Sequence, residues 1–299
     1  MRRATATAAP TKLLDYLKLA DGHLAARGVE SSRLDAELLL AHALGIGRVE
    51  LYTSYDRPLT AIEVDRFREL LRRRAARELA AYIVGTREFW SLALEVDRRV
   101  LIPRPETECL VEAALRAIRA MAPARNGGGL RVLDLGTGSG AIAVALASEI
   151  AELTIVATDV SEAALEVAPK NASSHGVADR IEFRQGDLFG ALRDDERFDA
   201  VVSNPPYCKS AEVAAMEPEL REWEPAGALV SGRDGMDASA RIIDGAAGFL
   251  VPDGQLLLEV GTQAELVGQR LASAGWRDVH SEKDLAGRMR VVAARRPGA

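Results

Sequence analysis

The chain contains little cysteine and no long apolar run. Its only cysteines, Cys109 and Cys208, form no CxxC motif, so the sequence predicts neither a disulfide scaffold nor a structural zinc site, and a reducing compartment fits best. No run of about 18 apolar residues occurs, and Lys12, Asp15 and Lys18 interrupt the segment after the basic start. A secretory signal is not predicted, and we expect a cytoplasmic protein without a membrane segment.

Histidine is also scarce. The four histidines lie outside the motifs described below, at His23, His42, His175 and His280. We expect ordinary surface or core residues at these positions, and the sequence predicts no metal requirement.

An excess of positive charge is missing as well. The chain has 38 Lys and Arg against 44 Asp and Glu, a formal net charge of -6, which argues against a protein that grips a nucleic-acid backbone over its whole surface. One local basic cluster, "RFRELLRRRAAR" at 66–77, holds six arginines. Such a run is usually a solvated helix face and less often a docking face for an acidic partner. Stable nucleic-acid binding is not expected.

The first part of the chain has a helical pattern. Apolar residues recur at steps of three and four from about 11 to 78, and Thr60 stands three residues before Glu63, a capping-box signature. The stretch 82–102 alternates apolar and polar residues, which favours a short hairpin. We therefore expect an N-terminal helical domain over 1–81, a hairpin linker over 82–102 and a larger domain over 103–299.

The larger domain alternates apolar strands with helices. The expected strands are "LRVLDLG", "LTIVATD", "IEFRQGD", "FDAVVSNPP", "GQLLLEVG", "WRDVHSEKD" and "MRVVAARR". This alternation is the signature of an α/β fold with a doubly wound, mostly parallel sheet of seven strands. Because the last two strands are joined by a short link, one of them is expected to run antiparallel.

A glycine-rich loop follows the first of these strands. In "VLDLGTGSGAIAVALA", Gly136, Gly138 and Gly140 stand between a strand and a helix, where backbone N–H groups can approach a ligand closely. The spacing differs from the G-x-G-x-x-G of dinucleotide binders, and Asp134 just before it would repel a pyrophosphate. A cationic or zwitterionic ligand suits Asp134 better.

Acidic residues close the next two strands. Asp159 lies 25 residues after Asp134, where an acid accepts the hydroxyls of a ribose in α/β sheets. Asp187 closes the third strand, where it can accept an adenine amino group beside the apolar Leu188. S-Adenosylmethionine meets these demands, since it has an adenine, a free ribose, no phosphate and two cationic groups. If the glycine-rich loop is considered by itself, two other interpretations stay open: a nicotinamide-binding loop and a plain glycine-rich connection.

The fourth strand ends in "NPPY". Asn204 is expected to project into the same crevice, and its side-chain oxygen and the carbonyl of Pro205 can accept both N–H bonds of a planar NH2 group. Pro205 and Pro206 make the turn stiff before a substrate arrives, and Tyr207 offers a flat face for an amide or a base. A simple strand-ending turn is the alternative for this motif taken alone.

Together, "NPPY" and "DLGTGSG" resemble the amino-methyltransferases that modify exocyclic or amide nitrogens. The segments "GTREFWSLALEVDRRVLIPRPETECLVE", "EPELREWEPAGALVSGRDGM" and "KDLAGRMRVV" narrow the resemblance to the HemK/PrmC family, the release factor glutamine methyltransferases. The similarity covers about residues 31 to 296. It implies a Rossmann-like class I methyltransferase that methylates the glutamine (N5) of the Gly-Gly-Gln motif of peptide chain release factors, in translation termination.

The resemblance implies that the loop from Gly136 to Gly140 and Asp159 hold the cofactor, that Leu188 packs the adenine, and that the Asn204 turn receives the glutamine. The cofactor-binding residues expected from all these arguments are Asp134, Gly136, Thr137, Gly138, Ser139, Gly140, Asp159, Asp187, Leu188 and Asn204. The expected catalytic residues are Asn204, Pro205 and Tyr207, and the expected substrate-binding residues are Asn204, Pro205, Pro206 and Tyr207. The helical N-terminal domain is expected to help grip the release factor, and a monomer is expected.

Several positions depart from the family pattern: Leu79 and Ala80 stand where a proline is usual, Cys208 where an aliphatic residue is common, and Met289 in an otherwise acidic segment. Two other functions stay open. One is an adenine or other exocyclic-amine methyltransferase acting on nucleic acid, because adenine N6 and a glutamine amide pose the same chemical problem, and the other is a non-catalytic cofactor-binding interaction module.

Overall fold

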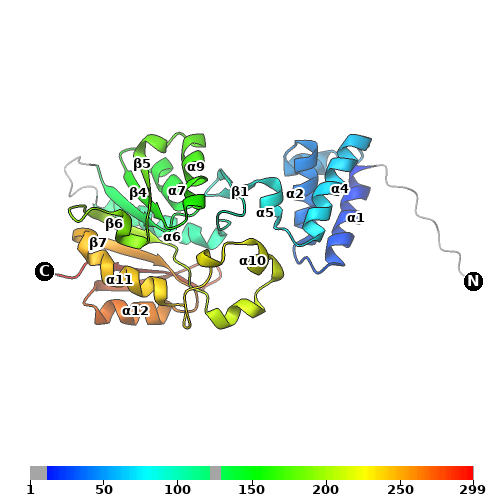
Figure 1. Cartoon of the computed structure of the whole chain (residues 1–299). Coiled ribbons are helices and arrows are strands. Elements are labelled where there is room, and N and C mark those ends of the chain that lie inside the picture. Colours follow the sequence, from blue (N-terminus) through cyan, green and yellow to red (C-terminus); the bar gives the residue numbers. More distant parts are fainter. Residues whose placement is uncertain (1–11, 122–128, 299) are drawn as a thin grey trace, which may run out of the picture. The chain divides into compact units, whose positions relative to one another are not determined.

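The structure is a computed structural model that describes residues 12–121 and 129–298. The described residues fall into two compact units, with the division between Gly85 and Thr86 (Figure 1). Each unit has its own hydrophobic core. The division into 1–81, 82–102 and 103–299 stays a prediction.

The first unit is helical. Its helices are α1 (Leu13–Ala25), α2 (Ser32–Leu44), α3 (Arg48–Thr53), α4 (Ala61–Ala75) and α5 (Ala80–Val84). Leucines from α1 and α2 and Phe67 from α4 form its core, as the spacing of apolar residues predicts. Thr60 caps α4, because its side chain accepts from the Glu63 amide while the Glu63 carboxylate accepts from the Thr60 amide.

A two-stranded hairpin opens the second unit. Strand β1 (Thr86–Phe89) pairs antiparallel with β2 (Leu92–Glu95). The two residues of the turn, Trp90 and Ser91, both have positive φ, 52° and 57°, which is the backbone of a turn that suits the twist of a hairpin. The hairpin is shorter than 82–102, since α5 continues to Val84 and β2 ends at Glu95.

Among the described residues, seven strands form the main sheet. They are β3 (Arg131–Leu135), β4 (Thr154–Asp159), β5 (Ile181–Gln185), β6 (Phe198–Ser203), β7 (Leu250–Glu259), β8 (Arg277–Lys283) and β9 (Met289–Arg295). Their order is β5-β4-β3-β6-β7-β9-β8. Only β9 runs antiparallel to its neighbours among these strands. The expected doubly wound, mostly parallel fold is confirmed.

Helices cover both faces of this sheet, as Figure 1 shows. On one face α6 (Glu108–Met121), α7 (Ala141–Glu149) and α9 (Ala168–Ser174) pack on alternate residues of the strands. On the other face α11 (Asp237–Phe249) and α12 (Ala264–Ser273) pack on the residues between them. Strand β6 is therefore buried along its whole length, as expected for a central parallel strand.

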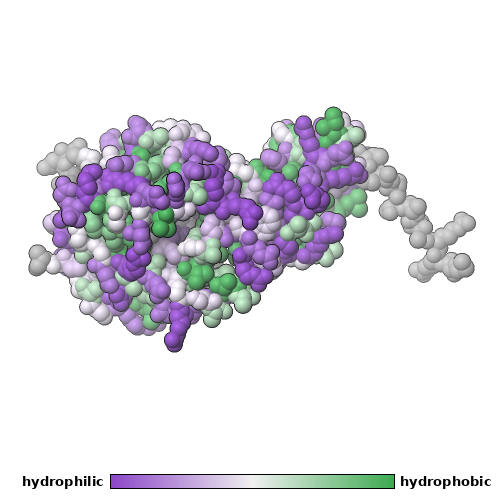
Figure 2. Space-filling model, in the orientation of Figure 1, coloured by the Kyte–Doolittle hydropathy of each residue, from purple (hydrophilic) through white to green (hydrophobic). Residues whose placement is uncertain are grey.

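Short helices lie in the connections between the longer elements. They are η1 (Pro105–Thr107), α8 (Glu162–Leu165), η3 (Ala178–Arg180), η4 (Leu188–Ala191), η5 (Ser210–Ala215), α10 (Pro218–Trp223) and η6 (Ala226–Ala228). The face in Figure 2 is mostly hydrophilic, with small hydrophobic areas between polar side chains. Within the residues that the structure describes, no helix has the length and apolar character needed to span a membrane.

Candidate active site

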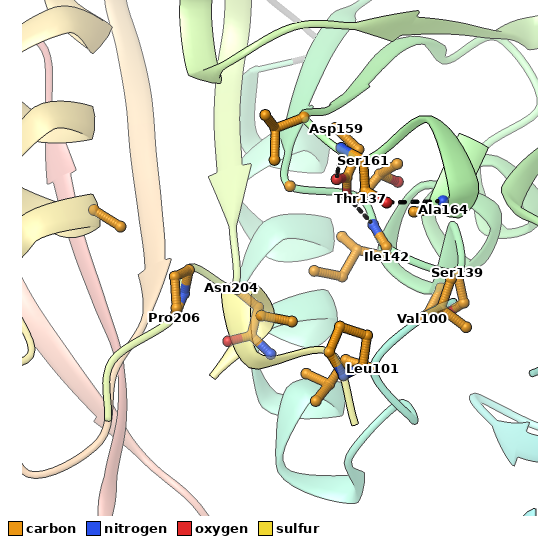
Figure 3. Close-up of a pocket in the computed structure, with 18 of the residues that line it drawn as sticks. Val100, Leu101, Thr137, Ser139, Ile142, Asp159, Ser161, Ala164, Asn204 and Pro206 are labelled. Carbon is orange, nitrogen blue, oxygen red and sulfur yellow. Dashed lines mark hydrogen bonds between the residues drawn. The ribbon is translucent and has the colours of Figure 1, made fainter. Parts of the chain in front are cut away.

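A cavity of about 520 Å³ opens at the carboxyl edge of the sheet in the second unit. Strand β3 pairs with β4 on one side and with β6 on the other, so the chain reverses its winding direction here, where ligands of open α/β sheets bind. Asp159 and Ser161 lie toward one end of the cavity and Asn204 and Pro206 toward the other (Figure 3). One ligand in this cavity can therefore reach both motifs.

The glycine loop lines one wall. Gly136 and Gly138 have φ values of 72° and 57°, in the left-handed region that favours glycine. A Cβ added at either position would meet no protein atom within 4 Å, so it would protrude into the open space. The loop thus offers bare backbone to a ligand.

Asp159 stabilises this loop from the end of β4. Its Oδ2 accepts from the Gly138 amide at 2.8 Å, and its Oδ1 accepts from the Ser161 amide at 2.9 Å. Each carboxylate oxygen can accept a second hydrogen bond. Since Asp159 also lines the cavity, it can hold the loop and still accept from the hydroxyls of a ribose.

Asp134 does not line the cavity. Its side chain is fully buried, and Oδ2 accepts from the Thr137 hydroxyl at 2.7 Å. Burial raises the pKa of this carboxyl group to about 7; the Thr137 hydroxyl opposes the rise and the charge of Asp159 adds to it. Asp134 therefore positions the glycine loop through Thr137, and its direct contact with a cofactor stays a prediction.

The raised pKa of Asp134 predicts a pH effect on stability. Because the pKa of Asp134 in the folded state lies above the ordinary value of an aspartate, about 4, Asp134 favours the folded state when protonated, and this contribution is lost as the pH rises from about 4 through 7. Asp134→Asn removes this titration. The free energy of unfolding of the wild type, relative to the variant, should therefore fall by as much as ~4 kcal/mol between pH 4 and 8. Urea unfolding of both proteins at each pH measures it, and parallel pH curves would contradict it.

Asp187 and Leu188 lie at the end of β5 and line the cavity. The Asp187 carboxylate already accepts from Arg241 of α11 at 2.7 Å, an ion pair between exposed side chains. Leu188 has a φ of 51°, an unusual conformation for a branched residue. The next residue, Phe189, stacks on Phe249 with ring centres 5.1 Å apart, and all three side chains pack against the same core cluster. These apolar side chains favour binding of a flat ligand ring beside Leu188.

Asn204 follows β6 at the other end of the cavity. Its Nδ2 donates to the Thr107 hydroxyl at 3.2 Å, and within the described residues nothing donates to its Oδ1. This oxygen is therefore available to a substrate N–H group. Cys208 fixes the chain just beyond the turn, since it exchanges backbone hydrogen bonds of 2.9 Å with Leu229 and Ser231.

Tyr207 is held beside the cavity and is not part of its wall. Its carbonyl accepts from the Gln263 side chain, and its ring packs so closely on Gly261 that a Cβ there would lie 2.9 Å from Cδ2. Burial raises the pKa of its hydroxyl to about 12, and Glu259 contributes to the rise. The ring therefore holds the turn in place, and its stacking on a substrate stays a prediction.

The structure brings most of the predicted residues together. Those that line the cavity are Gly136, Thr137, Gly138, Ser139, Asp159, Asp187, Leu188, Asn204 and Pro206, and those that do not are Asp134, Gly140, Pro205 and Tyr207. Gly140 begins α7 with a φ of 82°, and a Cβ there would lie 3.1 Å from the Ala168 Cβ. The backbone conformation and the close contact together favour glycine at this position.

Three arginines on the cavity wall were not predicted. Arg99 pairs with Asp97 and Glu166, Arg104 with Glu224, and Arg241 with Asp187. Since each guanidinium already has a carboxylate partner, the wall offers poor binding to a phosphate. Glu224 also accepts from the Ile102 amide at 3.2 Å, which ties the segment before η1 to the segment after α10. Arg104 belongs to the segment "PRPETE" and Glu224 to the segment "EWEP". Nothing in the spacing of these segments indicated that the two residues pair.

Within residues 12–121 and 129–298, no three or more His, Cys, Asp or Glu side chains are grouped so that they could hold a metal ion. The polar groups that line the cavity are backbone amides, hydroxyl groups, the carboxylates of Asp159 and Asp187, the three paired arginines and the side-chain amide of Asn204.

Comparison with known proteins agrees with this geometry. Residues 15–85 match the family described as PrmC N-terminal domain, and residues 118–218 match the Methyltransferase small domain. The chain is 41% identical to "Release factor glutamine methyltransferase" of Rhodopirellula baltica over 97% of this chain and 98% of that protein. It is 45% identical to the protein of the same name from Cereibacter sphaeroides, over 95% and 99% of the two chains.

Among solved structures, the chain is similar to a methyltransferase from Pyrococcus furiosus. The TM-score is 0.50 at 20% identity, and the match covers 69% of this chain and 90% of that one. This likeness supports the methyltransferase fold.

Proposed function

Because the chain belongs to the family of release factor glutamine methyltransferases, we propose that it transfers a methyl group from S-adenosylmethionine to the side-chain amide nitrogen of the glutamine in the Gly-Gly-Gln motif of peptide chain release factors. The observation that carries the proposal is the available Oδ1 of Asn204, on a rigid turn that shares one cavity with the glycine loop.

The residues of the cavity fit the cofactor. Gly136 and Gly138 leave open space where side chains would stand, and Asp159 offers carboxylate oxygens for the ribose. Leu188 supplies an apolar wall for the adenine. The cavity arginines already have carboxylate partners, which suits a ligand without phosphates.

When bound, S-adenosylmethionine supplies an electrophilic methyl group on its sulfonium sulfur. An amide nitrogen is a poor nucleophile, because its lone pair is delocalised into the carbonyl group. The Asn204 Oδ1 and the Pro205 carbonyl would each accept one N–H of the substrate, which aligns the nitrogen and stabilises the positive charge that grows on it. Transfer would form the new N–C bond as the methyl–sulfur bond breaks, with the sulfur leaving as a neutral thioether, and the methylated nitrogen would then lose one proton to water.

The two prolines keep these acceptors in place before the substrate arrives, so little reorganisation is needed during transfer. We assign the helical unit, which matches the PrmC N-terminal domain, to recognition of the release factor. The protein is proposed to act as a cytoplasmic monomer.

A nucleic-acid amino group poses the same chemical problem as a glutamine amide, so the turn alone leaves that function open. The net charge of -6 argues against it. Four of the six arginines in the 66–77 cluster pair with acidic side chains: Arg68 with Asp65, Arg72 with Glu69, Arg73 with Glu78 and Arg74 with Asp35. These pairs leave less free positive charge for phosphates.

Radiolabelled S-adenosylmethionine distinguishes the two substrates. The protein should label a release factor and leave DNA and RNA unlabelled. The matched control is a release factor whose Gly-Gly-Gln glutamine is replaced by alanine, which should stay unlabelled. Label in nucleic acid but not in the release factor would contradict the proposal, and absence of transfer to any substrate would favour a non-catalytic binding module.

A further inference from the structure

A side chain from another connection anchors the Asn204 turn beyond its prolines. Gln263 lies between β7 and α12, and its Nε2 donates to the Tyr207 carbonyl. Within the described residues, no other group donates to this carbonyl. A carbonyl can only accept, so the contact fixes the direction of the Gln263 amide, with its nitrogen toward the turn.

Gln263 is itself held in place. It is the residue from which α12 begins, and its backbone carbonyl accepts from the Val267 amide at 2.9 Å. The residue is only 4% exposed. A helix end and a buried side chain therefore set the position of the donor, and groups held on regular elements are placed more precisely than groups on loops.

Two glycines make room for this hydrogen bond. Gly235 has a φ of 79°, and a Cβ there would overlap with both the Gln263 Nε2 and the Tyr207 carbonyl oxygen. A Cβ on Gly261 would lie 3.0 Å from the Gln263 Oε1 and 2.9 Å from the Tyr207 Cδ2. Backbone from two further segments thus packs against the two partners and restricts their movement.

The Gln263 amide is only half satisfied. Its Oε1 is buried and has no hydrogen-bond partner within the described residues. A buried amide oxygen without a partner lowers the free energy of unfolding. The oxygen end of Gln263 therefore destabilises the fold, and what the side chain supplies is the donor at its nitrogen end.

The prolines make this anchor important for the turn. Neither Pro205 nor Pro206 has an N–H group to donate. The first end of the turn is fixed by the pairing of β6 with β7 and by the bond from Asn204 to Thr107. Within the described residues, the Tyr207 carbonyl is the first hydrogen-bonded group after Asn204. The Pro205 carbonyl lies between these two fixed points.

From this arrangement we infer that Gln263 is a positioning residue, which holds the far end of the Asn204 turn and so keeps the Pro205 carbonyl and the Asn204 Oδ1 aligned with the substrate amide. The inference deepens the proposed function and rests on it. Gln263 does not line the cavity, so it need not touch either the substrate or the cofactor.

Gln263→Met in the full-length protein tests the inference, because it keeps the length of the side chain and removes the donor. With rates expressed per cofactor-binding site, kcat for methylation of a release factor should fall at least about tenfold, since the acceptors lose their alignment. The KM for the release factor and the Kd for S-adenosylmethionine should stay within about threefold, because the acceptors act on charge that grows in the transition state. The matched control is Gln269→Met, at an exposed glutamine of α12, which should keep the wild-type kcat.

Gln263→Glu separates the donor from the shape of the side chain. An ionised carboxylate can only accept, whereas the protonated acid can donate to the Tyr207 carbonyl, and burial favours the protonated form. At pH 6 the kcat of Gln263→Glu should exceed that of Gln263→Met at least about threefold, and the difference should shrink toward pH 9. Groups that titrate in both variants cancel from this ratio.

The outcomes separate this inference from the proposed function. A wild-type protein that transfers no methyl group contradicts the proposed function, and the inference with it. An active wild type with unchanged kcat in Gln263→Met contradicts only the role of Gln263. Equal kcat values for the two variants at every pH, or a KM and Kd that rise as kcat falls, would show that Gln263 acts through packing and not as a donor. If Gln263→Met fails to fold, the pH profile of Gln263→Glu relative to the wild type decides in the same way.

Discussion

Asn204→Ala should lower kcat for methyl transfer about 100- to 1000-fold, the range seen when one preorganised group that stabilises transition-state charge is removed. The variant lacks the oxygen that accepts from the substrate amide, and the remaining Pro205 carbonyl can hold only one N–H bond. The Kd for S-adenosylmethionine should change little, because the glycine loop and Asp159 are unaffected. Single-turnover kinetics together with calorimetric titration of the cofactor measure both quantities.

Glu212→Ala is a suitable control for this experiment. Glu212 is exposed in η5, on the segment that follows the turn, and it does not line the cavity. The control should keep the wild-type kcat. If Asn204→Ala also kept it, Asn204 would not be the acceptor that orients the amide.

Asp159→Ala should weaken S-adenosylmethionine binding about 100-fold. Two hydrogen bonds from ribose hydroxyls to a carboxylate contribute roughly 3 kcal/mol. The substitution also leaves the amides of Gly138 and Ser161 without their acceptor, so the loop loses support. Isothermal titration calorimetry on the purified protein measures the change.

Asp194→Ala is the matched control, because Asp194 is exposed and lies outside the cavity. Its Kd should equal that of the wild type. A Kd for Asp159→Ala within threefold of that of the control would contradict the assignment of Asp159 to the cofactor.

The sequence was sufficient for the fold because local patterns determine it. Strands such as "FDAVVS" are apolar on both faces, and they alternate with helices, so a doubly wound sheet follows. Two glycines, Gly136 and Gly138, follow one strand, and Asp159 ends the next. Because these strands are parallel neighbours, the sheet brings all three residues to one crevice. These residues could therefore be predicted as neighbours before the structure was known.

Contacts between distant segments could not be predicted. Thr107 and Asn204 are 97 residues apart, and Glu224 accepts from an amide 122 residues away. No periodicity or spacing encodes such pairs, since they depend on how loops cross above the sheet. Asp134 shows the same limit: its place beside the glycine loop indicated ligand contact, whereas its side chain lies in the core and holds Thr137.

Tandem mass spectrometry of a release factor after incubation with the protein and S-adenosylmethionine tests the central claim most directly. We predict one added methyl group on the side-chain amide of the Gly-Gly-Gln glutamine, present with the wild type and nearly absent with Asn204→Ala. An unmodified glutamine in the wild-type reaction, or a methyl group on another residue, would contradict the account.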